Sequence, residues 1–139
     1  MELTSPLLAY GYLRRRLNAD VEEFWAVALN AEKAPLASAC LFRGSVDSCL
    51  FHPRDVFRFA CRNNAAALIV AHNHPSGNVE PSDHDEAVNQ QLLAAALILQ
   101  IPVTDHLILA GRRYFSFLQT GRMDLVERVL SGPGARGGP

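Results

Sequence analysis

Residues 66–85, AALIVAHNHPSGNVEPSDHD, join an apolar run, a turn-rich segment and the start of a helix. The run from Ala66 to Ala71 has strand length and no polar side chain, which is typical of a strand covered on both faces. The segment 72–81 contains prolines and a glycine, so we expect a loop there. Ser82 is a suitable N-cap for a following helix that ends before Pro102.

The same patterns predict the remaining elements. Ser5 followed by Pro6 predicts the start of a first helix that ends near Asn18. Further along the chain we expect strands at 24–29, 37–42 and 49–51, a helix from Pro53 to about 63, and a hairpin of strands 103–110 and 114–118. Strands and helices interleave without a regular period, which favours an α/β three-layer sandwich with a mixed β-sheet.

Length and composition restrict the class of protein. The chain has 139 residues, enough for a single domain, which we place at 1–130; the Gly/Pro-rich tail, 131–139, is expected to be disordered. Apolar residues make up 49% and the net charge is −1, so the chain should fold and has no bulk attraction for nucleic acid or anionic lipid. Three scattered cysteines and the lack of a leader or spanning segment predict a cytoplasmic protein with no membrane partner.

Two histidines and one aspartate have the spacing of metal ligands. His72 and His74 lie two residues apart at the predicted strand end, so their side chains point to the same side. Asp85 falls in the first turn of the next helix. Two imidazoles and one carboxylate would leave a fourth position for water, as in a catalytic zinc centre. The plainer alternative is that His-x-His is an accident and that Asp85 only forms a capping interaction with Ser82.

A metal-activated water needs a general base, and two adjacent acids are candidates. Glu22 and Glu23 precede the first buried strand, and the residues alone do not choose between them. Ser82 could cap the helix or donate a hydrogen bond to an oxyanion. We expect the other three histidines, His52, His84 and His106, to be structural. We also expect Asp105-His106 to order a strand end.

The motif itself resembles a known family. His72-Asn73-His74 followed by Ser82 and Asp85 matches the JAMM signature, and HNHPSG with the later PS is most similar to the RadC-type branch of the MPN/JAB domains. The resemblance extends over residues 5–120 through further matches, which include Glu22-x-Phe24, 52–56, 64–66, 101–106 and 114–117.

This resemblance implies a fold, a cofactor and residue roles. It implies a cytidine-deaminase-like sandwich with His72, His74 and Asp85 as Zn²⁺ ligands. Ser82 would be the oxyanion helper and Glu22 the general acid/base, since the acid of this branch stands two residues before the phenylalanine.

The implied activity is that of a zinc metallopeptidase acting on peptide or isopeptide bonds of a protein or peptide substrate, including ubiquitin-like proteins. The alternatives are a non-catalytic MPN-type interaction module and a DNA-repair accessory protein. The branch usually carries an N-terminal helix-hairpin-helix region that this sequence lacks, so nucleic acid is the less favoured partner.

Overall fold

The chain alternates helices and strands around one sheet. The computed structural model describes residues 1–44 and 52–126. In chain order the elements are α1 (Pro6–Arg14), β1 (Glu23–Leu29), β2 (Pro35–Arg43), α2 (Pro53–Arg62), β3 (Ala67–Asn73), α3 (Asp83–Leu99), β4 (Val103–Ala110) and β5 (Arg113–Ser116).

The five strands form a mixed sheet in the order β2-β1-β3-β4-β5. β3 lies at its centre, antiparallel to β1 and parallel to β4, while the two edge strands are antiparallel to their neighbours. Every residue of β3 is buried, as its continuous apolar run predicts. The end of β3 is therefore a rigid platform for the residues that follow it.

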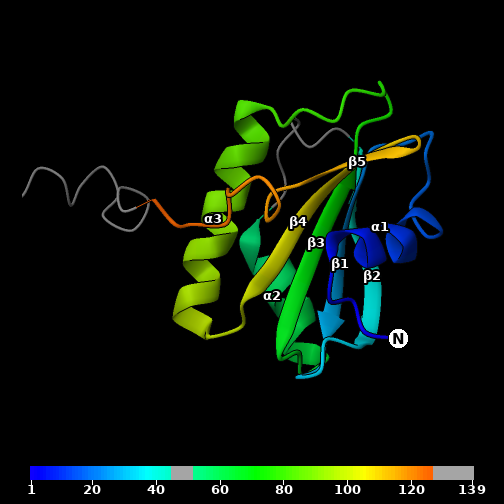
Figure 1. Cartoon of the computed structure of the whole chain (residues 1–139). Helices are drawn as coiled ribbons and strands as arrows, with labels where there is room; N and C mark the ends of the chain where they lie inside the picture. Colours follow the sequence, from blue (N-terminus) through cyan, green and yellow to red (C-terminus); the bar gives the residue numbers. More distant parts are fainter. Residues whose placement is uncertain (45–51, 127–139) are drawn as a thin grey trace, which may run out of the picture.

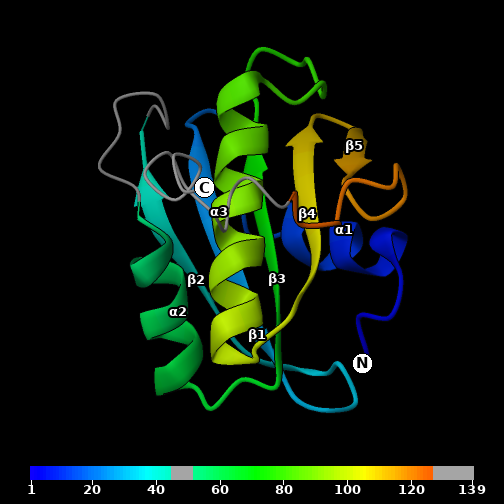
Figure 2. The same cartoon turned by 90° about the vertical axis from the view of Figure 1, so that its left-hand side faces the viewer.

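Helices cover both faces of the sheet (Figures 1 and 2). α2 and α3 pack on one face around a core that contains Phe24, Val70 and Leu92. α1 covers the opposite face, where Leu13, Val27 and Ile69 belong to a second core. The three layers of the predicted α/β architecture are thus present.

Several predicted boundaries differ from the structure. α1 ends at Arg14 instead of near Asn18, because the backbone N–H groups after it fold back onto Leu13 O in a closing turn. β5 ends at Ser116, before the predicted 118, because the N–H of Phe117 bonds instead to His106 O. The strand expected at 49–51 and the tail 131–139 lie outside the described residues.

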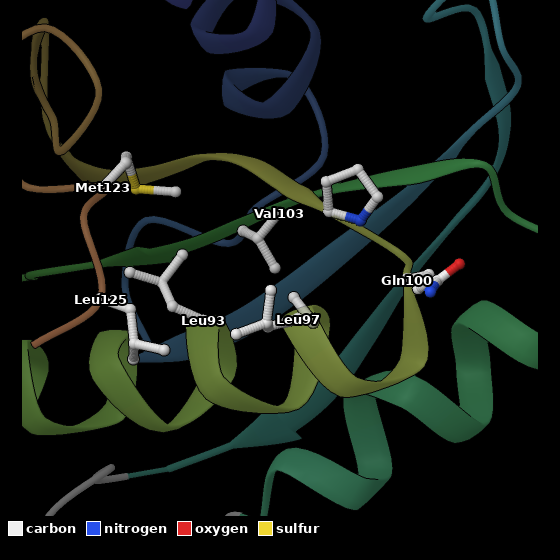
Figure 3. A pocket seen from close by; sticks show the side chains of 8 residues that line it. Leu93, Leu97, Gln100, Val103, Met123 and Leu125 are labelled. Atoms are coloured by element: carbon white, nitrogen blue, oxygen red, sulfur yellow. The ribbon is translucent and has the colours of Figure 1, made fainter. Parts of the chain in front are cut away.

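An apolar groove lies at the carboxyl-terminal half of α3 (Figure 3). Leu93, Leu97, Val103 and Leu125 line this space of about 480 Å³. The groove lies about three turns along α3 from the helix N-terminus, where Ser82 and Asp85 lie. Across residues 1–44 and 52–126, no helix combines the length and the apolar character that crossing a bilayer requires.

Candidate metal centre

β3 carries the first histidine of the motif. The strand runs two residues beyond the predicted end and includes His72 and Asn73, which pair with β1 and β4. The expectation of a loop beginning at His72 was therefore wrong, because both neighbouring strands continue to supply hydrogen-bond partners there. His72 is buried and lies opposite Phe24 of β1, while His74 stands just past the strand and is partly exposed.

Asp85 reaches the histidines from the first turn of α3. Ser82 is the N-cap: its Oγ accepts from Asp85 N at 3.1 Å, and Ser82 N donates to Asp85 Oδ2 at 2.8 Å. This reciprocal capping box fixes the carboxylate at the helix start. The capping interpretation and the metal interpretation thus hold together, because the capped carboxylate also faces both imidazoles.

The donor atoms of the three side chains converge on one point. His72 Nε2 lies 3.0 Å from Asp85 Oδ1, and His74 Nε2 lies 3.2 Å from Asp85 Oδ2. The two Nε2 atoms are 3.2 Å apart. Tetrahedral zinc with ligand distances of about 2.0–2.1 Å separates its ligand atoms by about 3.3–3.4 Å. The distance between the two Nε2 atoms is close to this value, and each Nε2 has one carboxylate oxygen of Asp85 at a similar distance, Oδ1 for His72 and Oδ2 for His74. The residues present fit a metal ion with N, N and O ligands.

Electrostatics within the cluster favour a charged Asp85. Burial by itself would raise the pKa of Asp85, but hydrogen bonds from His72 and His74 hold this pKa well below its usual range. The hydrogen bond to Asp85 raises the pKa of His74. A metal ion would compete with protons for these same nitrogen and oxygen atoms.

A hydrogen-bond relay behind His72 selects its tautomer. Asn89 Nδ2 donates to Arg122 O at 3.1 Å, which turns Asn89 Oδ1 toward His106 Nδ1 at 3.0 Å. His106 Nδ1 must then donate, so its Nε2 accepts from His72 Nδ1 at 3.1 Å. With Nδ1 bonded to His106, Nε2 is the ring nitrogen of His72 that faces Asp85 and would face a metal ion, as in metal sites where a second residue orients the ligand.

His74 is oriented in the same way by the loop. Its Nδ1 lies 2.6 Å from Asn78 O, a carbonyl that can only accept, so Nδ1 donates and Nε2 is the ring nitrogen that faces Asp85 and His72. Both imidazoles thus present Nε2 toward the position of a cation.

The relay residue His106 lies inside the predicted strand 103–110. It is fully buried in β4, and its carbonyl accepts from Phe117 N directly after β5 ends, in line with the expectation that Asp105-His106 orders a strand end. Burial holds its pKa well below the usual range, so it is neutral and can accept from His72. His84 flanks the motif, and its buried Nε2 has no hydrogen-bond partner among the described residues.

The structure separates the two candidate acids. The Glu23 carboxylate accepts from Asn18 N, from Trp25 Nε1 and from Arg43, so it is engaged in holding the start of β1. Glu22 is half-buried, and its side chain makes no hydrogen bond or ion pair within the described residues. The charge of Glu22 adds to that of Asp85 in raising the pKa of His74.

Asn73, between the two histidines, holds the backbone on both sides of Glu22. Its Nδ2 donates to Val21 O at 2.7 Å and to Asn18 O at 2.8 Å, and its Oδ1 accepts from Glu23 N at 2.7 Å. Asn73 is buried. Asn73 was not among the predicted site residues, although strand alternation alone sends Asn73 to the face opposite His72. We call these three hydrogen bonds the Asn73 clamp.

Comparison with known proteins places this centre in a family. Residues 3–122 match the family model described as a RadC-like JAB domain. The chain belongs to the RadC family. The UPF0758 protein YfjY of Escherichia coli K12 is 41% identical over 119 residues, a match that spans 85% of this chain and 74% of that protein.

Other RadC relatives are longer. The UPF0758 protein of Staphylococcus aureus strain Newman is 39% identical over 103 residues, which cover 74% of this chain and 45% of the relative. The match to the staphylococcal RadC protein is thus confined to less than half of its length. An activity of the whole staphylococcal protein therefore does not by itself establish the activity of this shorter chain.

Proposed function

We propose that this RadC-family chain is a zinc-dependent metallopeptidase that hydrolyses peptide or isopeptide bonds. The observation that carries the proposal is the convergence of His72 Nε2, His74 Nε2 and the Asp85 carboxylate, with the half-buried Glu22 just before β1, the strand that pairs with β3. An N, N, O ligand set with an open position is found in catalytic zinc sites such as those of metallopeptidases.

His72, His74 and Asp85 would hold the ion. When bound, zinc supplies Lewis acidity that polarises a carbonyl group and activates a water molecule. The Glu22 carboxylate accepts a proton from the attacking water at one oxygen. It then returns this proton to the nitrogen of the leaving amine as the C–N bond breaks and the new C–O bond remains.

Ser82 has a hydroxyl proton left to donate. Its oxygen accepts from Asp85 N at the helix cap, and its side chain is exposed at the mouth of the cluster. The O–H can therefore point toward a developing oxyanion while the lone pair stays on the cap. Because Ser82 accepts at the cap with its oxygen and can donate with its hydroxyl proton, the role of oxyanion helper is compatible with its role as N-cap.

Three broader expectations are part of the same proposal. We propose that the five-stranded sheet with helices on both faces is of the cytidine-deaminase-like type and that residues 1–130 act as one domain. The substrate would be a protein or peptide, ubiquitin-like proteins included, in the cytoplasm.

The test combines metal analysis with a substrate panel. We expect one zinc per purified chain, measured by mass spectrometry of the metal, and hydrolysis of peptide or isopeptide-linked substrates. Glu22→Gln should keep its zinc and lose about 10²–10⁴-fold in rate. Asp20→Asn, an exposed acid on the same connection, is the matched control and should retain the parent rate.

Two outcomes would contradict the proposal. If Glu22→Gln hydrolyses the panel as fast as the parent chain, Glu22 is not the general base. If zinc binds at full occupancy and no substrate is cleaved, the non-catalytic interaction module becomes the better explanation.

A further inference from the structure

A second hollow reaches His74, one of the three candidate metal ligands His72, His74 and Asp85, which we call the metal cluster. It has a volume of about 260 Å³ and is formed where three parts of the chain meet: the end of α1 with the residues after it, the end of β3, and the β4–β5 turn. His74 lines this hollow and also belongs to the metal cluster. A group bound there would therefore contact His74, one of the three candidate metal ligands. We call it the His74 pocket.

The walls of the His74 pocket are tied in place. Tyr10 Oη donates to Gly111 O at 3.1 Å, which joins α1 to the β4–β5 turn. Arg113 donates to Gly77 O at 2.7 Å, which joins the same hairpin to the loop after His74. The pocket is thus formed before any ligand arrives, a property that reduces the cost of binding.

Apolar side chains and one cation line the pocket. Leu17, Leu109 and Ala110 provide apolar surface, and no carboxylate is among the lining residues. Arg14 lies at the rim, where it is exposed, with its guanidinium 5.4 Å from the centre of the Tyr10 ring. Arg14 makes no ion pair or hydrogen bond within residues 1–44 and 52–126.

Several other arginines of the chain are already engaged. Arg43 pairs with Glu23, Arg122 with Glu86, and Arg16 donates to Tyr12 O. Arg14 thus differs from these three arginines: it stands beside an apolar pocket, and its guanidinium pairs with no carboxylate of the residues that the structure describes. An anionic group that also carries some aliphatic surface would complement both features.

We propose that the His74 pocket binds a carboxylate-bearing residue of the substrate next to the scissile bond, with Arg14 pairing to that carboxylate. The inference rests on the proposed function for the identity of the substrate as a peptide. The pocket is smaller than the roughly 300–1,000 Å³ of ordinary small-molecule sites, which suits a short chain segment. The carboxylate can belong to an Asp or Glu side chain or to the C-terminus of the peptide.

The first experiment measures binding without turnover. Zinc-loaded Glu22→Gln protein is titrated into three fluorescent alanine–glycine peptides: one with a central glutamate and an amidated end, its glutamine counterpart, and the glutamine peptide with a free C-terminus. We expect the glutamate peptide, the free-acid peptide or both to bind about three- to fivefold more tightly than the amidated glutamine peptide, and more weakly at high salt. The preferred peptide identifies the source of the carboxylate.

Variants of two adjacent arginines then locate the interaction. Arg14→Ala should remove the preference for the carboxylate, and Arg14→Glu should transfer it to a lysine peptide. Arg15→Ala is the matched control: Arg15 is an exposed arginine next in sequence that lines a different groove, with Leu7 and Leu8, and its variant should keep the preference.

Failure of the pocket and failure of the proposed function give different results. Equal affinity for all three peptides, no binding of any of them, or equal effects of Arg14→Ala and Arg15→Ala would overturn the pocket assignment. The parent protein is incubated with the same peptides in parallel. Cleavage of the peptides without any preference for a carboxylate would support the proposed peptidase activity and contradict the pocket assignment. Preferential binding of a carboxylate peptide without cleavage would support the pocket assignment and contradict the peptidase activity.

Discussion

Removal of the Asn73 side chain should destabilise the protein through the backbone that flanks Glu22. The side chain is buried and makes three hydrogen bonds of 2.7–2.8 Å to Asn18, Val21 and Glu23. A net contribution of about 0.5–1.5 kcal/mol for each of the three bonds gives a loss of about 1.5–4.5 kcal/mol for Asn73→Ala. That is a large part of the roughly 5–15 kcal/mol by which a domain is stable.

Guanidinium unfolding of the zinc-free protein, followed by circular dichroism, measures this loss. Gln91→Ala on the exposed side of α3 is the control and should change the free energy of unfolding by less than about 0.5 kcal/mol. Asn73→Asp keeps the acceptor for Glu23 N but turns a carboxylate oxygen toward two carbonyl groups, so it should be no more stable than Asn73→Ala near neutral pH.

The clamp lies on the opposite side of β3 from His72, so zinc affinity should change far less than the 10–100-fold typical of a residue that orients a ligand. A loss of stability below about 1 kcal/mol for Asn73→Ala, or an Asn73→Asp protein as stable as the parent, would refute the argument from the three hydrogen bonds.

Three further predictions concern the surroundings of the cluster. Asn89→Ala should weaken zinc binding about 10–100-fold in competition with a chromophoric chelator, because His106 loses the partner that fixes its tautomer. Glu23→Gln should lower the free energy of unfolding. Burial by itself would raise the pKa of Glu23, but hydrogen bonds lower it below its usual value. The difference in free energy of unfolding between the parent and Glu23→Gln should therefore be fully present above about pH 4.5 and should shrink as the pH falls through this lowered pKa. In the zinc-free protein, the lowered pKa of Asp85 stabilises the folded state above about pH 4, and so at both pH 5.5 and pH 7.5. The raised pKa of His74 stabilises the zinc-free folded state fully only below about pH 6.5, and this contribution is lost as the pH rises through the raised pKa. The increase in Tm on adding zinc should therefore be larger at pH 7.5 than at pH 5.5.

Local sequence patterns predicted the parts of the site that depend on local geometry. The buried run before His72 identified the central strand, and the Ser82-x-x-Asp85 spacing identified the capped start of α3. Both patterns operate over a few residues, so no knowledge of the tertiary structure was needed. The convergence of Asp85 on the histidines depends on how the intervening loop folds, and there the resemblance to the family carried the prediction.

The relay behind His72 could not be found in this way. His106 meets His72 because β4 lies parallel to β3 in a register that pairs Val70 with His106, and the sequence does not encode this register in any short segment. One signal was nevertheless available. Asn89 stands four residues after Asp85, on the same face of α3, so a polar residue on a buried stripe already indicated a partner near the metal cluster.

Strand alternation explains why the two adjacent acids have different roles. Glu23 shares a face of β1 with Trp25 and Val27, the face covered by α1, and it bonds to Trp25 there. Phe24 points to the other face, where it lies opposite His72 and its ring is 6.0 Å from that imidazole. A residue one step before Glu23 falls on the Phe24 side, which puts Glu22 toward the metal cluster.

The same alternation in β3 makes the chemistry and its support separable. His72 faces α3 and the metal cluster, whereas Asn73 faces α1 and holds the chain that leads into β1. β1 and β3 are direct neighbours, so each face of this strand pair carries residues from both strands. One face carries His72 of β3 on the side toward which Glu22 points, and the other face carries Glu23 of β1 together with Asn73 of β3. A change confined to one face should therefore alter metal binding with little effect on folding, and a change confined to the other should alter folding with little effect on metal binding. Stability and zinc affinity that fell together in every variant of both faces would show that the sheet does not separate them.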